Sequence, residues 1–187
     1  MPPKVKITKE EIINTAIDII RLEGTDALNA RRIAAELRCS TQPVFSNFAT
    51  MDDLKEDVIR AAYDHYVGFL QRESESGRYP KYKAFGMAYV RFAEEERELF
   101  KLLFMRDRTG EDMSPPPDFT ASAEMIAEAN GVSLQVAELM HLETWTCVHG
   151  IGVMIATSFL PLDGDMISRM LSDVYQGIRS RHVTEDE

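Results

Sequence analysis

Apolar residues recur along most of the chain at intervals of three and four positions, and glycine or proline separates the runs. This spacing is typical of amphipathic helices, and we find no stretch with the strict alternation that indicates a strand. The pattern therefore predicts an all-α fold of about nine helices. The segment TGEDMSPPPDF (109–119) is expected to be a loop, because consecutive prolines cannot continue a helix.

Capping residues set the expected limits of these helices. Thr8 and Glu11 have capping-box spacing, and Gly24 can end the first helix because glycine readily takes a positive φ. The other expected N-caps are Asn29, Ser40, Thr50, Ser133, and Asp163 or Asp165. The expected helices span about residues 8–24, 29–37, 40–48, 50–77, 80–96, 98–106, 121–129, 133–161 and 163–181. The second of them is expected to bury Ile33, Ala34 and Leu37.

The segment RRIAAELRCSTQPVFSNF (31–48) predicts two short helices with a tight corner between them. The second helix has Val44 and Phe48 as apolar anchors and is otherwise polar, with Pro43 in its first turn. A helix–turn–helix explains this polarity, because polar side chains of the second helix can reach base edges in the major groove of DNA. The alternative is an ordinary αα-corner whose second helix is polar because water covers it.

The same part of the chain resembles the DNA-binding domain of TetR-family regulators. The resemblance is continuous over about residues 8–58 and rests on Ile13–Asp18 with Gly24, on LNARRIA (28–34) and on STQPVFSNF (40–48). It implies a helix–turn–helix domain over residues 1–50 and a helical ligand-binding and dimerisation domain over residues 51–187. It also implies a homodimer that binds a palindromic operator in double-stranded DNA and that a small effector releases, with repression as the default.

The resemblance also implies which residues contact DNA. They are Arg31, Arg32, Thr41, Gln42, Pro43, Phe45, Ser46, Asn47 and Lys55. Thr41, Gln42 and Pro43 fall on the base-reading positions, and glutamine is the residue type that pairs with adenine through two hydrogen bonds.

Three departures from the family pattern affect the expected grip on phosphates. Phe45 stands where the family usually has tyrosine, Arg38 stands where the turn usually has glycine, and ATM (49–51) lacks the basic residue common after the third helix. Phosphate contacts are then expected from Lys4, Lys6, Lys9, Arg31, Arg32, Arg38 and Lys55. We expect DNA binding with a modest dependence on salt.

The charge of the chain is unevenly distributed. The net charge is −10, but residues 1–50 carry seven Lys or Arg against six Asp or Glu, which leaves a net +1 there. The remaining residues therefore carry −11, and the first part can approach phosphates without strong repulsion.

The sequence also predicts where the protein resides. The N-terminus has no apolar run like that of a secretory leader, and the most apolar segment (148–162) is shorter than the ~20 residues that cross a bilayer. Cys39 and Cys147 are expected to be reduced thiols. We therefore expect a cytoplasmic protein that does not contact a membrane.

The eighth and ninth expected helices, 133–161 and 163–181, are the candidates for a dimer interface. Small residues that permit close approach are Gly150, Gly152 and Ala156, and the apolar area comes from Val153, Ile155, Ile167, Met170, Leu171, Val174 and Ile178. One pair of helices from each subunit would form a four-helix bundle. The alternative is that these residues fill the core of one subunit.

Methionine and aromatic residues of the second half are candidates for an effector cavity. The predicted ligand-binding residues are Phe85, Phe100, Phe104, Met125, Met140, Trp145 and His149. Trp145, His149 and Gly150 also resemble the Trp…His-Gly signature of one class of TetR-type C-terminal domains. The alternative is plain core packing, with His149 hydrogen-bonded inside the protein. No cofactor is implied, and the acidic balance favours a cationic or a neutral apolar effector.

Two other functions remain open at this stage. Glu138 and His141 form an ExxH pattern, but a di-iron bundle needs two such patterns and two further glutamates, and a second ExxH is absent from the sequence. Neither GxSxG nor a glycine-rich phosphate loop occurs, so we expect no enzyme. The other possibility is a helix–turn–helix fold that has lost DNA binding and acts as a protein-interaction module.

Overall fold

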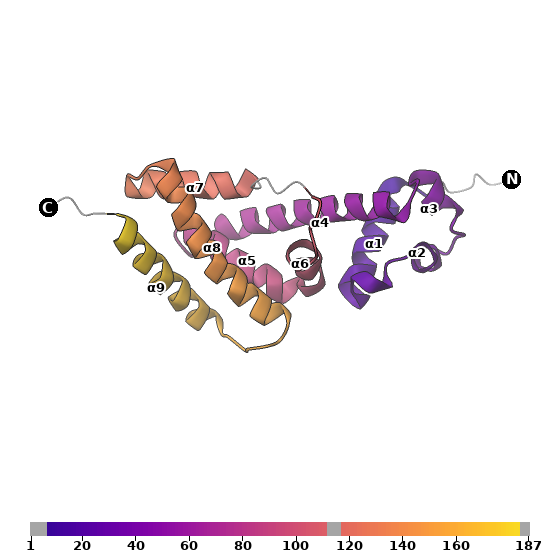
Figure 1. Ribbon diagram of the computed structural model, residues 1–187. Helices are drawn as coiled ribbons and strands as arrows, with labels where there is room; N and C mark the ends of the chain where they lie inside the picture. Colours follow the sequence, from indigo (N-terminus) through magenta and orange to yellow (C-terminus); the bar gives the residue numbers. More distant parts are fainter. Residues whose placement is uncertain (1–6, 112–116, 184–187) are drawn as a thin grey trace. The chain divides into compact units, whose positions relative to one another are not determined.

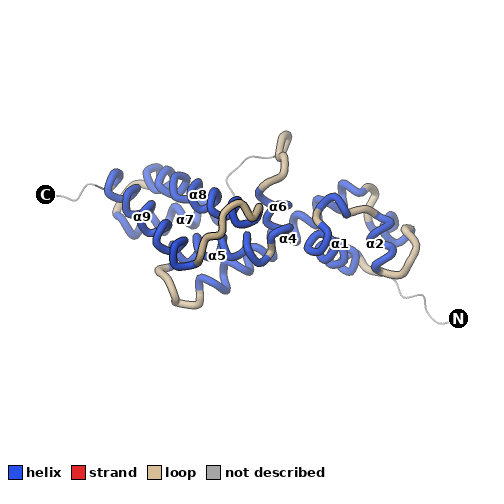
Figure 2. The backbone as a smooth tube through the Cα atoms, turned by 90° about the horizontal axis from the view of Figure 1, so that it is seen from below, coloured by secondary structure: helices blue, strands red, loops and turns tan. Residues whose placement is uncertain are grey.

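The computed structural model describes residues 7–111 and 117–183. Figure 2 shows helices joined by loops, and the described residues contain no strand, which confirms the predicted all-α fold. The elements are α1 (Lys9–Glu23), the 3-10 helix η1 (Thr25–Ala27), α2 (Ala30–Glu36), α3 (Gln42–Asn47), α4 (Met51–Ser74), α5 (Lys81–Glu95), α6 (Arg97–Phe104), α7 (Pro117–Asn130), α8 (Leu134–Ala156) and α9 (Gly164–His182). No helix of the described residues is long and apolar enough to cross a membrane.

Most of the predicted helix starts are confirmed by capping hydrogen bonds. Thr8 and Glu11 form a reciprocal capping box, in which the Thr8 N–H donates to Glu11 at 2.7 Å and the Glu11 N–H donates to Thr8 at 3.1 Å. The side chains of Asn29, Ser133 and Asp163 cap α2, α8 and α9 in the same sense. These contacts lie within four residues of one another, which is why the sequence reveals them.

The start of α3 differs from the prediction that Ser40 caps it. The residue before the helix is Thr41, which has helical dihedral angles (φ −71°, ψ −10°) and makes no capping hydrogen bond through its side chain. The cap position is therefore Thr41 and not Ser40, and no capping hydrogen bond from either side chain is formed with the described residues. Pro43 lies in the first turn, as predicted. Leu37, expected to be buried with Ile33 and Ala34, is only half-buried.

Two helices end in left-handed turns that do not use glycine. After α2, Arg38 has φ +52°, and the Cys39 N–H donates to the Ala34 carbonyl at 2.9 Å. After α8, Ser158 has φ +54°, and the Phe159 N–H donates to the Met154 carbonyl at 2.9 Å. Both are Schellman turns. The second ends α8 at Ala156, so the expectation that this helix continues to about residue 161 is wrong.

The loop predicted over residues 109–119 ends earlier than expected. Residues 112–116 lie outside the described residues, and α7 already begins at Pro117 instead of near residue 121. Proline is tolerated in the first turn of a helix because its missing N–H has no partner there. The last proline of the run therefore marks the start of this helix.

The chain packs as two units. The N-terminal unit consists of the residues up to Gly68 together with Glu96–Arg106, and it contains α1, α2, α3, most of α4, and α6 (Figure 1). Its core includes Ile12, Ile20, Ile33, Val44, Phe48, Leu54, Leu99 and Phe100. The sequence placed the division at residue 50, whereas the packing adds the first part of α4 and α6 to this unit.

The C-terminal unit contains the end of α4 with α5, α7, α8 and α9. In it α5, α7 and α9 all pack against α8, which is the central helix of the unit (Figure 1). Ala123, Ile126, Ala137 and Met140 form a buried cluster between α7 and α8. A Cβ atom on Gly86 would lie 3.2 Å from Cδ1 of Leu171, so glycine permits the close approach of α5 and α9.

Candidate DNA-binding surface and ligand cavity

The helix–turn–helix of the N-terminal unit is firmly anchored. Ile33 and Ala34 bury one face of α2, and Val44 and Phe48 are buried at α3. The Schellman turn at Arg38 fixes the corner between the two helices. Burial of four apolar side chains in so short a segment holds α3 in place, so the side chains of α3 that point outward have defined positions.

Two of the predicted base-reading residues have unoccupied polar groups. Gln42 is exposed and Thr41 is half-exposed, and neither side chain hydrogen-bonds to any other residue that the structure describes. A glutamine amide offers both a donor and an acceptor, and a threonine hydroxyl offers either. Pro43 is half-exposed beside them in the first turn.

The polar side chains in the second half of α3 are already engaged. The Ser46 hydroxyl donates to the Gln42 carbonyl at 2.8 Å. The Asn47 amide donates to the Pro43 carbonyl at 2.8 Å and to the Ile7 carbonyl at 3.4 Å. Asn47 therefore links the backbone at Ile7 to α3. Contact of Ser46 and Asn47 with DNA stays a prediction. Their donors are occupied within the protein, so they are weaker candidates than Gln42, whose donor and acceptor are both available.

Phe45 is the one aromatic side chain that α3 exposes. Its side chain is 52% exposed, although the neighbouring Val44 and Phe48 are buried. Phe45 follows Gln42 by three residues, so the two side chains lie on the same side of α3. A single exposed apolar side chain is common on protein surfaces, so the exposure of Phe45 makes it available for contact but does not by itself mark a site.

The basic residues around this surface differ in whether they form ion pairs within the protein. Arg31 and Arg38 are exposed and form no ion pair with another described residue. By contrast, Arg32 donates to Glu23 at 2.6 Å and to Glu36 at 2.7 Å, and these hydrogen bonds raise the pKa of Arg32 and lower that of Glu23. The resemblance assigns Arg31 and Arg32 similar roles, but of these two only Arg31 forms no ion pair with a described residue.

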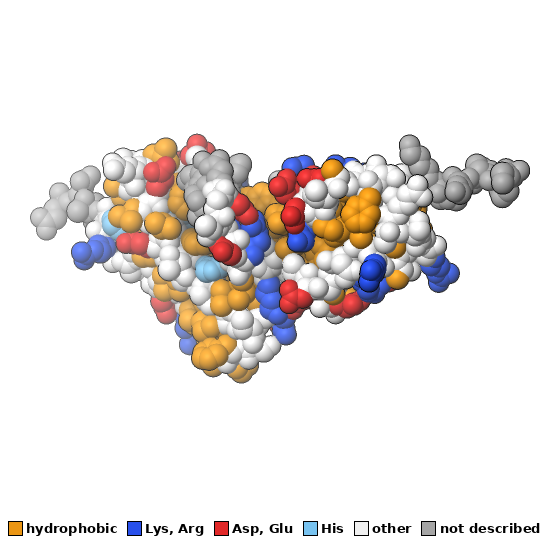
Figure 3. Space-filling model, turned by 45° about the vertical axis from the view of Figure 1, so that its right-hand side comes forward, with side chains coloured by type: hydrophobic (Ala, Val, Ile, Leu, Met, Phe, Trp, Pro, Cys, Tyr) orange, Lys and Arg blue, Asp and Glu red, His pale blue; other side chains and the backbone are white. Residues whose placement is uncertain are grey.

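The predicted lysines are also partly neutralised. Lys55 pairs with Asp52 at 3.1 Å, and Lys9 pairs with Asp57 while its ammonium lies 5.0 Å from the centre of the Phe48 ring. The hydrogen bond from Lys9 lowers the pKa of Asp57. Lys4 and Lys6 lie outside the described residues. Figure 3 shows the same mixture, with blue and red side chains interspersed on the visible surface of this unit.

The predicted dimer residues of α8 and α9 fall into two groups. Gly152, Ala156, Ile167 and Leu171 are buried within the C-terminal unit, so core packing accounts for them. The half-buried residues are Val153, Ile155, Met170, Val174 and Ile178. A Cβ atom on Gly150 would meet no atom within 4 Å, so this glycine leaves open space beside α8.

An apolar stripe on α8 was missed by sequence reasoning. Leu139 and Leu142 are 46% and 48% exposed. The half-buried Val153 lies on the same side of α8, about three helical turns after Leu142. Phe159 in the turn after α8 is 78% exposed, and Figure 3 shows hydrophobic side chains gathered at the lower end of this unit. The signal was the leucine pair at a spacing of three, opposite the residues that pack inward.

The predicted ligand-binding residues are divided between the two units. Phe100 and Phe104 pack in the N-terminal unit, where their ring centres lie 5.2 Å apart. Met140 is fully buried in the cluster between α7 and α8, and Phe85 and Met125 are half-buried. Core packing thus accounts for Phe100 and Met140.

Trp145 and His149 do meet, as their spacing predicts. Their rings stack with centres 4.9 Å apart, and the Tyr89 hydroxyl lies 2.8 Å from Nδ1 of His149. Burial lowers the pKa of His149. Tyr82 and His141 form a similar pair at 2.9 Å, and burial raises the pKa of Tyr82. These hydrogen bonds fit the alternative in which the histidines belong to the core.

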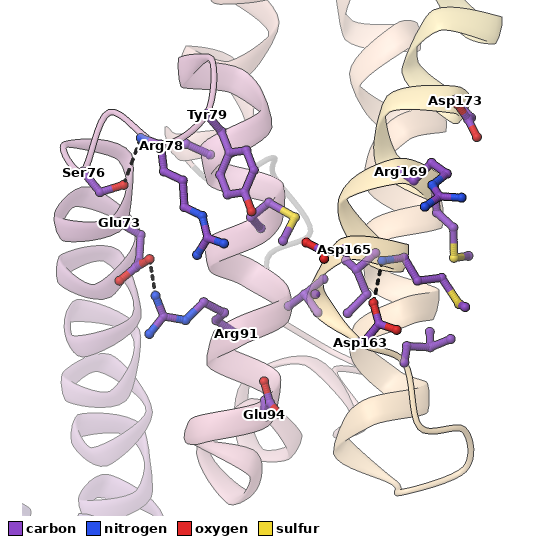
Figure 4. Close-up of a pocket in the computed structure, with 18 residues that line it drawn as sticks. Glu73, Ser76, Arg78, Tyr79, Arg91, Glu94, Asp163, Asp165, Arg169 and Asp173 are labelled. Carbon is purple, nitrogen blue, oxygen red and sulfur yellow. Dashed lines mark hydrogen bonds and ion pairs between the residues drawn. The ribbon is translucent and has the colours of Figure 1, made fainter.

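The C-terminal unit has a cavity of about 630 Å³ elsewhere. It lies between the end of α4, α5, and the start of α9, and none of the seven predicted ligand-binding residues lines it. Its apolar part includes Met87, Val90 and Ile167. Figure 4 shows Arg78 and Tyr79 pointing into it from one side and Asp165 from the other.

Some of the charged side chains that line this cavity form ion pairs with one another. Arg91 of α5 forms an ion pair with Glu73 of α4 (Figure 4), whereas Asp165 forms none with another described residue. Such a cavity can hold a molecule with an apolar body and a charged group. The residues come from segments about 90 positions apart in the sequence, so no local pattern could have revealed the site.

The ExxH residues do not form a metal site in the part of the chain that the structure describes. His141 is buried against Tyr82 and Phe119, whereas Glu138 is exposed. Among the described residues no group of three His, Cys, Asp or Glu side chains is placed to hold a metal ion.

The fold is similar to those of several solved structures. A protein of unknown function from Rhodococcus sp. RHA1 matches with a TM-score of 0.71 and 19% identity over 94% of this chain and 97% of that chain. A TetR-like transcriptional regulator from the same organism matches with a TM-score of 0.62 and 15% identity over 94% of this chain and 96% of that one. A TetR variant from Acinetobacter baumannii AYE in complex with minocycline matches with a TM-score of 0.63 and 16% identity over 96% and 100%.

Sequence comparison alone finds no relative. No protein-family model and no curated protein sequence matches the chain. The structural similarities extend over nearly the whole length of both chains in each case, and they confirm the fold that the sequence resemblance implies.

Proposed function

We propose that this chain, which has the fold of TetR-family regulators, is a cytoplasmic, ligand-responsive transcriptional repressor that binds a palindromic operator as a homodimer. The observation that carries the proposal is the outer side of α3, where Gln42 and Phe45 are exposed beside the half-exposed Thr41 and the helix is anchored by buried residues. A helix held in this way can enter the major groove without rearrangement. One such helix reads few base pairs, so two are needed for a specific site.

The experiment that tests the proposal is selection of bound duplexes from a random DNA pool. A symmetric dimer should recover a palindrome whose half-sites are one helical turn, or a multiple of it, apart. Recovery of no preferred sequence at low salt would overturn the proposal. It would then favour the protein-interaction module, for which the exposed Phe45 is the supporting feature.

The exposed stripe on α8 supports the dimer. Leu139 and Leu142 lie on the outside of the C-terminal unit, together with half-buried residues of α9 such as Met170 and Val174. Open space beside Gly150 lets another helix approach closely. The interface between subunits is therefore proposed to consist of these outward residues of α8 and α9, without the buried Gly152, Ala156, Ile167 and Leu171.

The cavity between α4, α5 and α9 is the proposed effector site. Its volume of about 630 Å³ lies in the usual range for small-molecule sites. Met87, Val90 and Ile167 offer an apolar surface, and the unpaired Asp165 suits a cationic group. The similar TetR variant is in complex with minocycline, so this fold can hold a small organic molecule.

The proposed response runs along α4. This helix begins three residues after Phe48, and Glu73 in its last turn lines the cavity. An effector that displaces the end of α4 changes the separation of the two α3 helices in the dimer, and DNA affinity falls. A coupling of about 1–3 kcal/mol corresponds to a roughly 5- to 150-fold change.

A thermal-shift screen that includes minocycline and tetraphenylphosphonium tests the effector site. A compound that raises the unfolding midpoint should weaken operator binding, and Asp165→Asn should weaken the effect of the cation. Glu138→Gln is the matched control, because Glu138 is an exposed carboxylate that does not line the cavity. A stabilising compound that leaves operator affinity unchanged would contradict this mechanism.

A further inference from the structure

We infer that each half-site of the operator contains adenine and thymine in the positions that face Gln42 and Phe45, with the Gln42 amide on an adenine and the Phe45 ring on the methyl group of a thymine. The inference rests on the proposed function and specifies the DNA that the same surface takes.

The first step is the placement of the two side chains. They are three residues apart on α3 and therefore lie side by side on the helix surface. Gln42 is exposed and Phe45 is 52% exposed, while Val44 and Phe48 are buried. A surface that contacts Gln42 thus also contacts Phe45.

The second step removes competing readers. The Ser46 hydroxyl and the Asn47 amide donate to backbone carbonyls of α3 at 2.8 Å in each case. Ser46 and Asn47 keep acceptor atoms, but their donors are occupied, so neither can both donate to and accept from one base without losing an internal bond. Pairing with a base through two hydrogen bonds therefore falls to Gln42, whose amide has no partner among the described residues.

The third step is the chemistry of the two groups. A glutamine amide can donate to one atom and accept from another, and in the major groove N7 and the N6 amino group of adenine present that pair. A phenyl ring cannot bond a phosphate, whereas its apolar surface is stabilised by contact with another apolar group. The C5-methyl of thymine is the apolar group that base pairs expose in the major groove.

The experiment uses the full-length protein and the duplex recovered from the random pool. Each thymine is replaced in turn by deoxyuridine, which removes the methyl group and keeps base pairing. One thymine in each half-site should show about fourfold weaker binding after replacement, as expected for one buried methyl group. Replacing its symmetry mate as well should multiply the loss, to roughly 15-fold.

Protein variants assign the effect to a side chain. Phe45→Ala should bind thymine and deoxyuridine duplexes equally, whereas Leu22→Ala should keep the wild-type ratio. Leu22 is a suitable control because it is 80% exposed in the same unit but lies on α1. Both substituted positions are exposed, so unchanged unfolding midpoints are expected and confirm that each variant folds.

A second modified base tests Gln42. Replacing adenine by 7-deazaadenine removes the N7 acceptor and should weaken wild-type binding roughly 5- to 150-fold at one position in each half-site. Gln42→Ala should show no such difference.

The outcomes separate this inference from the proposed function. If the pool yields no preferred duplex, the proposed function fails. If it yields a palindrome but no thymine shows a methyl effect, or if Phe45→Ala keeps that effect, the inference is overturned and the function stands.

Discussion

Arg38 is a single residue that both strains the helix–turn–helix and charges its surface. Its φ of +52° lies in the left-handed region, where a side chain with a Cβ atom is disfavoured by roughly 1–2 kcal/mol. Glycine would remove this cost. The arginine is exposed and has no ion pair with a described residue, so its charge is available to a phosphate group. Arg38 thus lowers the stability of the fold but adds a positive charge to its surface.

Arg38→Gly should raise the free energy of unfolding by about 0.5–1 kcal/mol, because the gain at positive φ exceeds the extra backbone entropy of glycine. Chemical denaturation followed by circular dichroism measures this. Arg38→Ala is the matched control, since it removes the charge but keeps the Cβ atom, and it should give no gain. Equal stabilities of the two variants would contradict the strain argument.

At the scale of elements, an ion-pair cluster joins the start of α6 to α1 and α4 inside the N-terminal unit. The guanidinium of Arg21 donates to both carboxylate oxygens of Glu96 at 2.8 and 2.9 Å, and Nε2 of His65 lies 2.9 Å from Glu96. Burial acts to raise the pKa of Glu96, but the hydrogen bonds from Arg21 and His65 outweigh it and lower the pKa. The charged form therefore stabilises this packing.

Glu96→Gln should cost about 1–3 kcal/mol of stability at pH 7, since it breaks charged hydrogen bonds that are half-buried. Because the pKa of Glu96 is lower in the folded protein, its contribution is complete above the ordinary pKa of 4.5 and is lost as the pH falls through the folded value. Unfolding measured from pH 7 down to pH 3 should show the two proteins converging.

The control for this cluster is Asp18→Asn. Asp18 approaches Arg21 at 3.4 Å but is largely exposed, so its loss should change stability by less than ~0.5 kcal/mol. A constant difference between wild type and Glu96→Gln at all pH values would show that the ion pair is not the cause.

The exposed leucines of α8 predict a second effect at this scale. Leu142→Glu should convert a dimer of about twice the 21.2 kDa chain mass into a monomer, because a carboxylate would be buried without a partner in the interface. Sedimentation velocity measures this. Leu22→Glu, at an 80% exposed position of α1, should leave the dimer intact. A dimeric Leu142→Glu protein would place the interface elsewhere.

Across the whole molecule, the features that could be predicted from the sequence are those set by residues close together in the chain. The caps at Thr8, Asn29 and Asp163 are contacts within three residues, so they and the helices they start were predictable. The turn at Ser158 was not, because serine rarely takes a positive φ and gives no warning of one. Helix α6 joins the N-terminal unit through long-range packing that no local pattern encodes.

The candidate sites also have some features that the sequence predicts and others that only the structure shows. The position of α3 and the exposure of Gln42 followed from the resemblance and from the sparse apolar pattern. The pairing of Arg32 with Glu23 and Glu36 needed the structure, since two neighbouring arginines look alike in sequence. The cavity depends on Arg78 and Asp165 lining the same space from distant parts of the sequence, which only tertiary packing brings about.

The difference between the unpaired Arg31 and Arg38 and the paired Arg32 predicts how DNA affinity of the proposed dimer depends on salt. With Arg31 and Arg38 of each subunit on phosphates, four contacts give a slope of log K against log [salt] of about −4. Arg31→Gln should reduce the slope by about two units, since both subunits lose a contact, and Arg32→Gln should leave it nearly unchanged. Affinities measured between about 50 and 200 mM salt test this. A larger loss for Arg32→Gln would mean that its ion pairs open on DNA.

The central claim is that α3 reads base sequence through Gln42, and one comparison tests it most directly. Wild type and Gln42→Ala are titrated against the recovered operator and against a scrambled duplex of equal length at one salt concentration. We predict that the variant loses about 1–3 kcal/mol on the operator and little on the scrambled duplex. Equal losses on both duplexes, or equal wild-type affinity for the two, would contradict the account.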